Sequence, residues 1–139
     1  MTNIGPILVA DDDADEIVLL QLAFIKAGLK NPLLAVGDGE ECVQYLRGDG
    51  KFADRSQYPI PQLLLLDLKM PRRNGFEVLE WLKSQPFENM VVVVLSGSDQ
   101  DDDIEKAMEL GADYYHIKNP DSQKRFELIK LLEQYLTQN

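Results

Sequence analysis

Four consecutive leucines, Leu63–Leu66, are followed at once by Asp67, and Pro61 and Pro71 bound the segment. A run this short and this apolar is typical of a strand buried on both faces, as in a parallel sheet covered by helices. A carboxylate at the end of such a strand is costly to desolvate unless a cation or hydrogen-bond donors offset the cost. Either Asp67 caps the next turn, or it belongs to a ligand site, because α/β folds bind ligands at the carboxyl ends of strands.

A second apolar run ends in the same way. Ile7–Ala10 is followed directly by Asp11, Asp12 and Asp13. Because the carboxyl ends of strands in a doubly wound sheet meet at one edge, these acids are expected to lie near Asp67. Two buried strands that both end in acids favour the ligand-site interpretation.

Strand and helix signals alternate along the chain, which is typical of parallel βαβ units. The expected strands are 7–10, 33–36, 63–66, 90–95 and 114–117. The expected helices run from about 15 to 27, 39 to 47, 75 to just before Pro86, a start capped by Ser98 or Asp99 to Gly111, and 122 to 136. Residues 48–61, rich in Gly, Asp and Pro, are expected to form a long loop. The pattern predicts one α/β domain spanning residues 1–139, with a doubly wound parallel sheet.

Composition excludes several classes of protein. The formal charge is −10, with 24 acidic against 14 basic residues, which argues against direct binding of nucleic acid. The chain has no apolar run of membrane length and no leader pattern, so we expect a cytoplasmic protein with no membrane contact. Cys42 is the only cysteine, which leaves no disulfide framework and no pair of thiol ligands, and we expect it to pack within a helix.

The side chains that follow the expected strands form one chemical set. In chain order they are Asp11 and Asp12, then Asp67, then Ser96 and Ser98, then Lys118. Unit charges about 4 Å apart at a surface-like dielectric repel by roughly 4 kcal/mol, so clustered carboxylates need a cation. Oxygen donors suit Mg²⁺, which commonly bridges protein carboxylates and phosphate oxygens. A carboxylate can attack phosphorus to form an acyl phosphate, so the set predicts a phosphoryl site.

A calcium loop is the competing metal hypothesis. Asp11, Asp13 and Asp15 occupy alternate positions, as in an EF-hand. Such a loop also needs Gly at its sixth and Glu at its twelfth position, where Glu16 and Leu22 stand. The spacing therefore disfavours calcium.

Taken in order, these motifs resemble the response-regulator receiver domains of bacterial two-component signalling over nearly the whole chain. The motifs are the acidic pair Asp11-Asp12, the pattern Asp-x-x-Met-Pro-x-x-x-Gly from Asp67 to Gly75, Ser96 before a small residue, and Lys118. The resemblance implies a flavodoxin-like sheet of strand order 2-1-3-4-5 with five helices. It also implies that Asp67 accepts phosphate from a phosphohistidine of a sensor histidine kinase. Mg²⁺ would be bound by Asp12, Asp67 and the backbone carbonyl of Lys69, with Asp11 acting largely through water.

The same resemblance implies a conformational switch. Ser96 would hydrogen-bond the phosphoryl group, Lys118 would pair with it, and Tyr115 would swing inward as an aromatic switch. The surface of the fourth helix, fifth strand and fifth helix would then change for a partner. Such a protein is a signalling phospho-acceptor rather than an enzyme, although it assists its own phosphorylation and dephosphorylation. With no effector domain expected, its output would pass to a downstream protein target or a phosphotransfer protein.

Some features depart from the family pattern. Asn119 separates Lys118 from Pro120, where receivers commonly have Lys-Pro, so the conformation of this loop, including a cis Asn119–Pro120 bond, stays open. Lys69 and Ser98 occupy positions that tune acyl-phosphate lifetime in the family. The long 48–61 loop resembles the stand-alone receivers associated with bacterial phytochromes. Relatives of that kind often pair through the last helix, so its apolar residues form either a homodimer face or part of the core: Leu128, Leu131 and Tyr135.

Two other functions compete with this one. A Mg²⁺-dependent hydrolase of the haloacid-dehalogenase type would also use Asp67 as nucleophile, but it expects Asp two residues later, where Lys69 stands. A degenerate receiver that binds partners without phosphate would lack an acid, the hydroxyl or the lysine, and none of these is missing.

Overall fold

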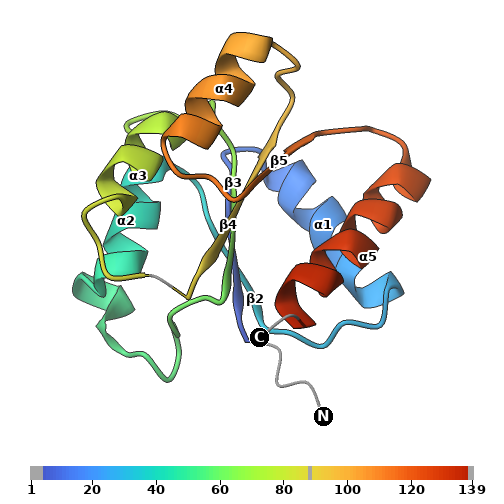
Figure 1. Cartoon of the computed structure of the whole chain (residues 1–139). Coiled ribbons are helices and arrows are strands. Elements are labelled where there is room, and N and C mark those ends of the chain that lie inside the picture. The colour runs from blue at the N-terminus through green and yellow to red at the C-terminus, as the bar shows by residue number, and fades with distance from the viewer. Residues whose placement is uncertain (1–4, 88, 138–139) are drawn as a thin grey trace.

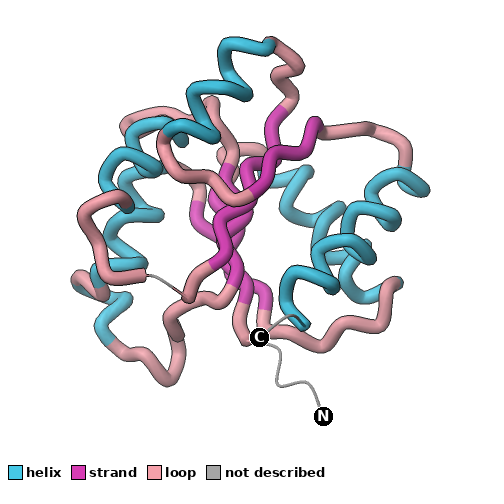
Figure 2. Tube along the Cα trace, in the orientation of Figure 1, coloured by secondary structure: helices cyan, strands magenta, loops and turns pink. Residues whose placement is uncertain are grey.

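A parallel sheet of five strands in the order β2-β1-β3-β4-β5 forms the centre of the computed structural model, which describes residues 5–87 and 89–137 (Figures 1 and 2). The strands are β1 (Ile7–Ala10), β2 (Leu33–Val36), β3 (Leu63–Leu66), β4 (Val91–Ser96) and β5 (Tyr114–Ile117). The helices are α1 (Ala14–Lys26), α2 (Gly39–Arg47), α3 (Gly75–Leu82), α4 (Asp101–Glu109) and α5 (Ser122–Thr137). Helices α1 and α5 cover one face of the sheet, and α2, α3 and α4 lie toward the other (Figure 1). The predicted doubly wound α/β fold is confirmed.

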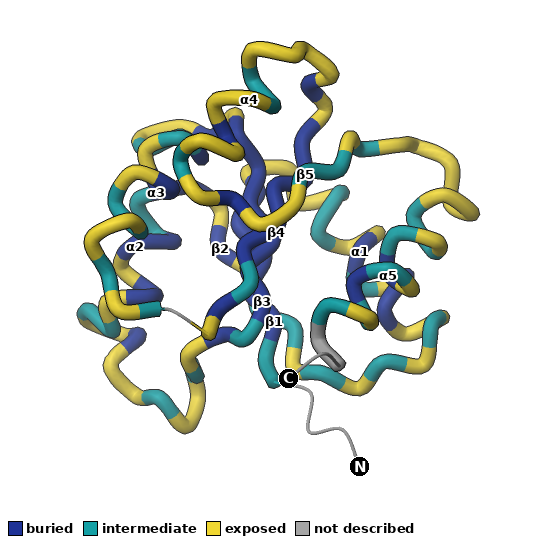
Figure 3. The backbone as a smooth tube through the Cα atoms, viewed as in Figure 1, coloured by how far each residue is buried: buried dark blue, intermediate teal, exposed yellow. Residues whose placement is uncertain are grey.

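The leucine run supplies both faces of the sheet. Leu64 and Leu66 pack in the core beneath α2 and α3, whereas Leu63 and Leu65 pack in the core beneath α1 and α5. This division follows from the pleat, which turns successive side chains to opposite faces. Strands β1 and β3, in the middle of the sheet, are buried along their whole length (Figure 3), so a continuous apolar run is the sequence that such a strand needs.

Strand register places the two acidic strand ends side by side. β1 and β3 pair from Ile7 opposite Leu63 to Ala10 opposite Leu66. Backbone hydrogen bonds then continue past the strands, because Asp67 N donates to Ala10 O at 3.0 Å and Lys118 N donates to Ser96 O at 2.8 Å. The first residues beyond the strands are thus held by the sheet itself.

Residues 48–61 are more ordered than the predicted loop. The 3₁₀ helix η1 (Gly50–Ala53) buries Phe52, whose ring lies 5.1 Å from the rings of both Tyr45 and Tyr58. The Arg55 guanidinium donates to the carbonyls of Tyr45 and Leu46 at the end of α2. The segment therefore has a small aromatic core of its own, which its polar composition conceals.

Four further features of the sequence can be compared with the structure. The fourth helix begins at Asp101 with Gln100 at the N-cap, so the expected cap at Ser98 or Asp99 is wrong by one or two residues. Cys42 is fully buried, as the packing interpretation predicts. Within residues 5–87 and 89–137 no peptide bond is cis, which makes the Asn119–Pro120 bond trans. None of the helices in the described ranges is both long and apolar enough to cross a bilayer.

Truncation of Leu64 tests how far the buried strand sets stability. Leu64→Ala should lower the free energy of unfolding by about 2–5 kcal/mol, because the side chain is fully buried and leaves a cavity. The matched control is Ile25→Ala, since Ile25 is 71% exposed and its truncation should change stability by about 0.5 kcal/mol or less. Urea unfolding of both variants measures the difference, and equal losses would contradict the buried-strand account.

Candidate functional site

One lysine joins the acids that end β1 and β3. The ammonium nitrogen of Lys118 lies 2.7 Å from Asp11 Oδ2 and 3.4 Å from Asp67 Oδ2. Lys118 follows β5, so its side chain must cross the end of β4 to reach the two acids. The three residues come from distant parts of the chain, and only the parallel sheet brings them together.

Asp67 is a buried carboxylate with few compensating partners. Its Oδ1 accepts a hydrogen bond from Leu68 N at 2.8 Å, and its Oδ2 faces Lys118. Burial raises the pKa of Asp67 to about 6, the Lys118 charge opposes the rise, and the nearby Asp11 charge adds to it. The ionised form of Asp67 is therefore held in a site that does not fully stabilise it, which is typical of a functional carboxylate.

Lys118 supplies the positive charge that partly stabilises ionised Asp67. Burial lowers the pKa of Lys118, but the hydrogen bond to Asp11 and the charges of Asp67 and Asp11 outweigh burial and leave the pKa raised. The lysine therefore stays cationic at neutral pH. The cleft is lined by four acids, Asp11, Asp12, Asp13 and Asp67, and by two lysines, Lys69 and Lys118, so its formal charge stays negative.

Asp12 completes a group of acids suited to a hard cation. One carboxylate oxygen from each of Asp11, Asp12 and Asp67 lies within 4.8 Å of the others, and Asp12 is the exposed member. Lys69 lines the same open cleft, next to Asp67. A set made of oxygen donors and open to solvent fits Mg²⁺, which keeps several of its own waters.

The loop after β4 forms the other wall of the cleft. Ser96 is buried, and its hydroxyl accepts a hydrogen bond from Ser98 N at 3.2 Å. The Ser98 hydroxyl donates to Asp103 in the first turn of α4 at 2.6 Å, and the hydroxyl of Tyr115 donates to Ser98 O at 2.8 Å. Ser98 therefore connects the end of β4 to both α4 and β5.

The first residue of α3, Gly75, packs closely against the backbone of Asp67 and Leu68. Gly75 N donates to Leu68 O at 2.9 Å, and a Cβ at Gly75 would lie 2.3 Å from Asp67 O. The backbone after Asp67 thus turns back so closely on itself that a side chain at position 75 would force the two segments apart. This contact gives a physical reason for the glycine in the Asp67–Gly75 pattern.

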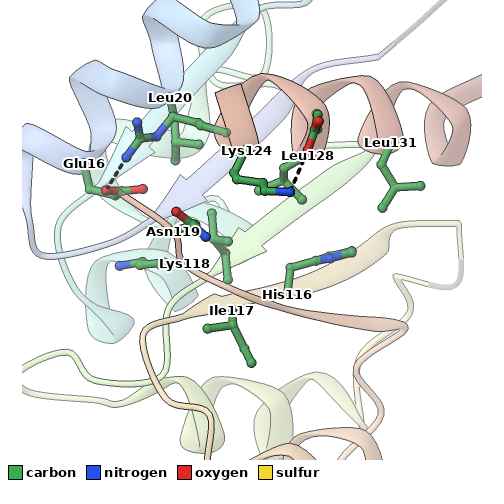
Figure 4. Close-up of a pocket in the computed structure, with 12 residues that line it drawn as sticks. Glu16, Leu20, His116, Ile117, Lys118, Asn119, Lys124, Leu128 and Leu131 are labelled. Atoms are coloured by element: carbon green, nitrogen blue, oxygen red, sulfur yellow. Dashed lines mark hydrogen bonds and ion pairs between the residues drawn. The ribbon is translucent and has the colours of Figure 1, made fainter. Parts of the chain in front are cut away.

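A second hollow lies beside the acid cleft, between β5 and α5. This groove of about 280 Å³ has Glu16, Lys118 and Asn119 toward one end and Leu131 toward the other (Figure 4). Glu16 pairs with Arg125 across it at 3.5 Å, which ties α1 to α5. Lys118 lines both the groove and the acid cleft.

The predicted site residues fall into two groups. The residues that line one cleft are Asp11, Asp12, Asp67, Lys69, Ser96 and Lys118. Tyr115 is instead packed against the core under α2, α3 and α4, and its hydroxyl is bonded to Ser98 O at the edge of the site. Asp103 is a partner of Ser98 that the sequence pattern does not indicate, because an acidic first turn of a helix is already accounted for by the helix dipole.

The α5 residues considered for a dimer face are also divided. Leu128 and Tyr135 pack against the core beneath α1 and α5, and the Tyr135 ring stacks on Tyr114 with centroids 3.8 Å apart. Leu131 lines the groove, as Leu128 also does. The core-packing alternative therefore has support at two of the three residues, and the homodimer stays a prediction.

The raised pKa of Asp67 makes stability depend on pH in a defined direction. In the absence of divalent metal the folded protein holds a proton on Asp67 between pH 3.8 and about 6 that the unfolded chain has lost. Stability from this group is therefore full below pH 3.8 and is lost as pH rises through about 6.

Asp67→Asn removes this pH-dependent penalty. In EDTA at pH 7.5 the free energy of unfolding of the variant should be about 2–3 kcal/mol higher than that of wild type, so the variant is more stable. The gain should disappear at pH 3.5, which serves as the internal control. Urea unfolding across the pH range measures it, and a wild type as stable as the variant at pH 7.5 would refute a raised pKa.

Comparisons with known proteins agree with this geometry. Residues 7–130 match the model of the response regulator receiver domain. Response regulator Rcp1 of Synechocystis sp. is 28% identical over 130 residues, covering 93% of this chain and 86% of Rcp1.

Solved structures of phytochrome response regulators are similar over nearly their whole length. The crystal structure of the phosphorylated cyanobacterial phytochrome response regulator RcpA gives a TM-score of 0.85 at 34% identity, covering 96% of this chain and 94% of RcpA. The Mn²⁺-bound form of Rcp1 gives a TM-score of 0.82 at 28% identity, with the same coverage of the two chains. The sheet order 2-1-3-4-5, the acid cleft and the match over residues 7–130 lead to one conclusion: this chain belongs to the response regulator receiver domain family of two-component signalling.

Proposed function

We propose that this protein accepts a phosphoryl group on Asp67 from the phosphohistidine of a sensor histidine kinase. The single observation that carries the proposal is the placement of Lys118 between Asp11 and Asp67 at the carboxyl edge of the sheet, with Asp12 beside them. A nucleophilic carboxylate, a fixed cation and further acids for a metal are the groups that phosphoryl transfer needs for positioning and charge neutralisation.

Mg²⁺ would be held by Asp12, Asp67 and the backbone carbonyl of Lys69, with Asp11 acting largely through water. When bound, it would neutralise charge on the acids and on the phosphoryl oxygens. Support comes from the three oxygen ligands within 4.8 Å of one another and from the similar protein Rcp1, which was solved with Mn²⁺. The net negative charge left after pairing with Lys118 also favours a divalent cation.

The transfer step uses the ionised form of Asp67. One carboxylate oxygen attacks phosphorus and forms the new P–O bond of an acyl phosphate. The P–N bond to the kinase imidazole breaks, and its electron pair returns to the imidazole nitrogen. Lys118 keeps its positive charge throughout and faces the side of Asp67 on which negative charge increases.

The β4–α4 loop would transmit the effect of phosphorylation at Asp67 to the surface of the protein. A hydroxyl at Ser96 that turns toward a phosphoryl group gives up its hydrogen bond from Ser98 N. Ser98 is also bonded to Asp103 and Tyr115, so its displacement would affect the contacts of α4 and β5 together. We propose that Tyr115 acts as the switch of the surface formed by α4, β5 and α5.

Several contacts must act together in this switch. Reversing a 99:1 preference between two states needs roughly 5.5 kcal/mol. A single hydrogen bond to a charged group contributes about 1.5–3 kcal/mol. Contacts of the phosphoryl group with both Ser96 and Lys118 are therefore required, and both residues line the cleft.

The proposed partners are a sensor histidine kinase and a downstream protein target or phosphotransfer protein. We treat the chain as one receiver domain that acts by protein contact rather than as an enzyme. The similarity to RcpA, a phytochrome response regulator solved in phosphorylated form, supports a kinase of the phytochrome class. The alternative function is a receiver that binds its partners without being phosphorylated. Phosphorylation of wild type and of an Asp67 variant distinguishes the two functions.

Asp67→Asn tests the phospho-acceptor. Acetyl phosphate with Mg²⁺ should add one phosphoryl group to wild type and none to the variant, because an amide oxygen is not a competent nucleophile. Asp99→Asn is the matched control, since Asp99 is an exposed acid in the neighbouring loop, and it should be modified as wild type is. Intact-mass spectrometry measures the adduct. Wild type that takes neither phosphate nor beryllofluoride would support the phosphate-independent alternative.

Lys118→Ala tests the role of the cation in keeping Asp67 ionised. Loss of the Lys118 charge removes an effect that lowers the pKa of Asp67, so that pKa should rise further. The pH–rate profile of modification by acetyl phosphate should shift to higher pH. The rate should fall about tenfold for each unit by which the pKa of Asp67 exceeds the pH of the experiment. Lys124→Ala, which alters the adjacent groove, should keep the wild-type profile. An unshifted profile for Lys118→Ala would contradict this role.

A further inference from the structure

Arg72 has an unusual backbone conformation close to the acid cleft. Its φ is +64°, and within the described residues it is the one residue other than glycine with a positive φ. Left-handed backbone is costly for a residue with a long side chain and persists where surrounding contacts hold it. The contacts that hold Arg72 are therefore informative.

The side chain of Arg72, which is 71% exposed, pairs with the N-cap residue of α2. Its Nε lies 2.9 Å from Asp38 Oδ2, and its Nη2 contacts the same oxygen. The Asp38 side chain is only 5% exposed, and its Oδ1 accepts from Glu41 N at 2.8 Å as the N-cap of α2. Burial raises the pKa of Asp38, but these hydrogen bonds and the Arg72 charge outweigh burial and leave the pKa lowered. The carboxylate is therefore ionised and bonded on both oxygens.

The backbone of the same loop touches α2 directly. A Cβ at Gly39 would lie 1.9 Å from Arg73 O, so the first residue of α2 and the loop are in contact without room for a side chain. Arg73 adds a second ion pair, with its Nη2 3.0 Å from Glu40 Oε2. Two successive arginines thus join the loop to one helix terminus.

The loop is also anchored where it leaves β3 and where it enters α3. Gly75 N is bonded to Leu68 O, and Asn74 forms a capping box with Glu77 at the start of α3. Residues 68–74 are therefore bonded to the start of α3 through Leu68 and Asn74, and to the start of α2 through Arg72 and Arg73. Lys69, which lines the acid cleft, lies between these anchors.

We propose that Arg72 is a positioning residue: its ion pair with Asp38 holds the 68–74 loop so that the backbone carbonyl of Lys69 is placed to bind Mg²⁺. The inference rests on the proposed function for the metal site. Asp38 lies next to the edge strand β2, outside the cleft, so the pair links a remote helix terminus to metal affinity. Losing an outer-shell partner of a metal ligand commonly costs about 10–100-fold in affinity.

Substitution by glycine separates the ion pair from the backbone strain. Glycine adopts a φ of +64° at no steric cost, so Arg72→Gly should fold while it loses the bond to Asp38. Asp38→Asn removes the charge but keeps an oxygen that can cap α2. Arg72→Lys keeps a positive charge but not the fork that contacts Asp38 through two nitrogens.

The experiment is a calorimetric titration of Mg²⁺ into each unphosphorylated full-length variant. Arg72→Gly and Asp38→Asn should each weaken Mg²⁺ binding by about tenfold, and the double variant should be no weaker than either, because both remove the same interaction. Arg72→Lys should recover part of the affinity. Arg47→Ala, which breaks the exposed Arg47–Asp49 pair at the other end of α2, should bind as wild type.

The outcomes distinguish this inference from the proposed function. If wild type binds Mg²⁺ and Arg72→Gly binds it equally well, the positioning role is wrong and the metal site stands. If wild type binds no Mg²⁺, the metal site of the proposed function is wrong, and the positioning role falls with it. Should Asp38→Asn fail to fold, Arg72→Gly and Arg72→Lys still decide the question. Additive losses in the double variant would show that the two residues act independently, which also overturns the proposal.

Discussion

The bridge from Lys118 to Asp11 and Asp67 is the interaction on which the arrangement of this edge of the sheet depends. Two buried carboxylates side by side repel each other, and a residue from another strand end supplies the compensating charge. The compensation is partial, since the pKa of Asp67 is still raised to about 6. This residual cost makes the site receptive to further positive charge, and a divalent cation is the simplest source of it.

The two loops that flank this bridge are held from outside the cleft. Ser98 in the β4–α4 loop is bonded to Asp103 and Tyr115, and Arg72 in the loop after β3 is bonded to Asp38. The sheet fixes the charged strand ends, because they continue its backbone hydrogen bonds. The bonds that hold these loops reach the N-cap of α2, the first turn of α4 and strand β5.

Much of the fold is predictable because each buried strand needs an unbroken apolar run, and a charged or polar residue must follow where burial ends. The limits of prediction appear at particular residues. Phe52 is buried in a segment of loop-like composition because it packs against Tyr45 and Tyr58, a contact that no local pattern reveals. The start of α4 was misplaced because Ser98, a good N-cap residue, makes its bonds to Gln100 N and Asp103 from outside the helix.

The sequence by itself determined the order of strands and helices, the apolar runs that become buried strands and the identity of the polar residues at the strand ends, because these follow from local hydrophobicity and turn chemistry. Only the tertiary structure decided which of those residues meet. The pairing of Lys118 with Asp11, and of Arg72 with Asp38, joins positions 107 and 34 residues apart. Charge pairs of this kind depend on distances of a few ångströms, which strand register and helix packing set and which no spacing along the chain encodes.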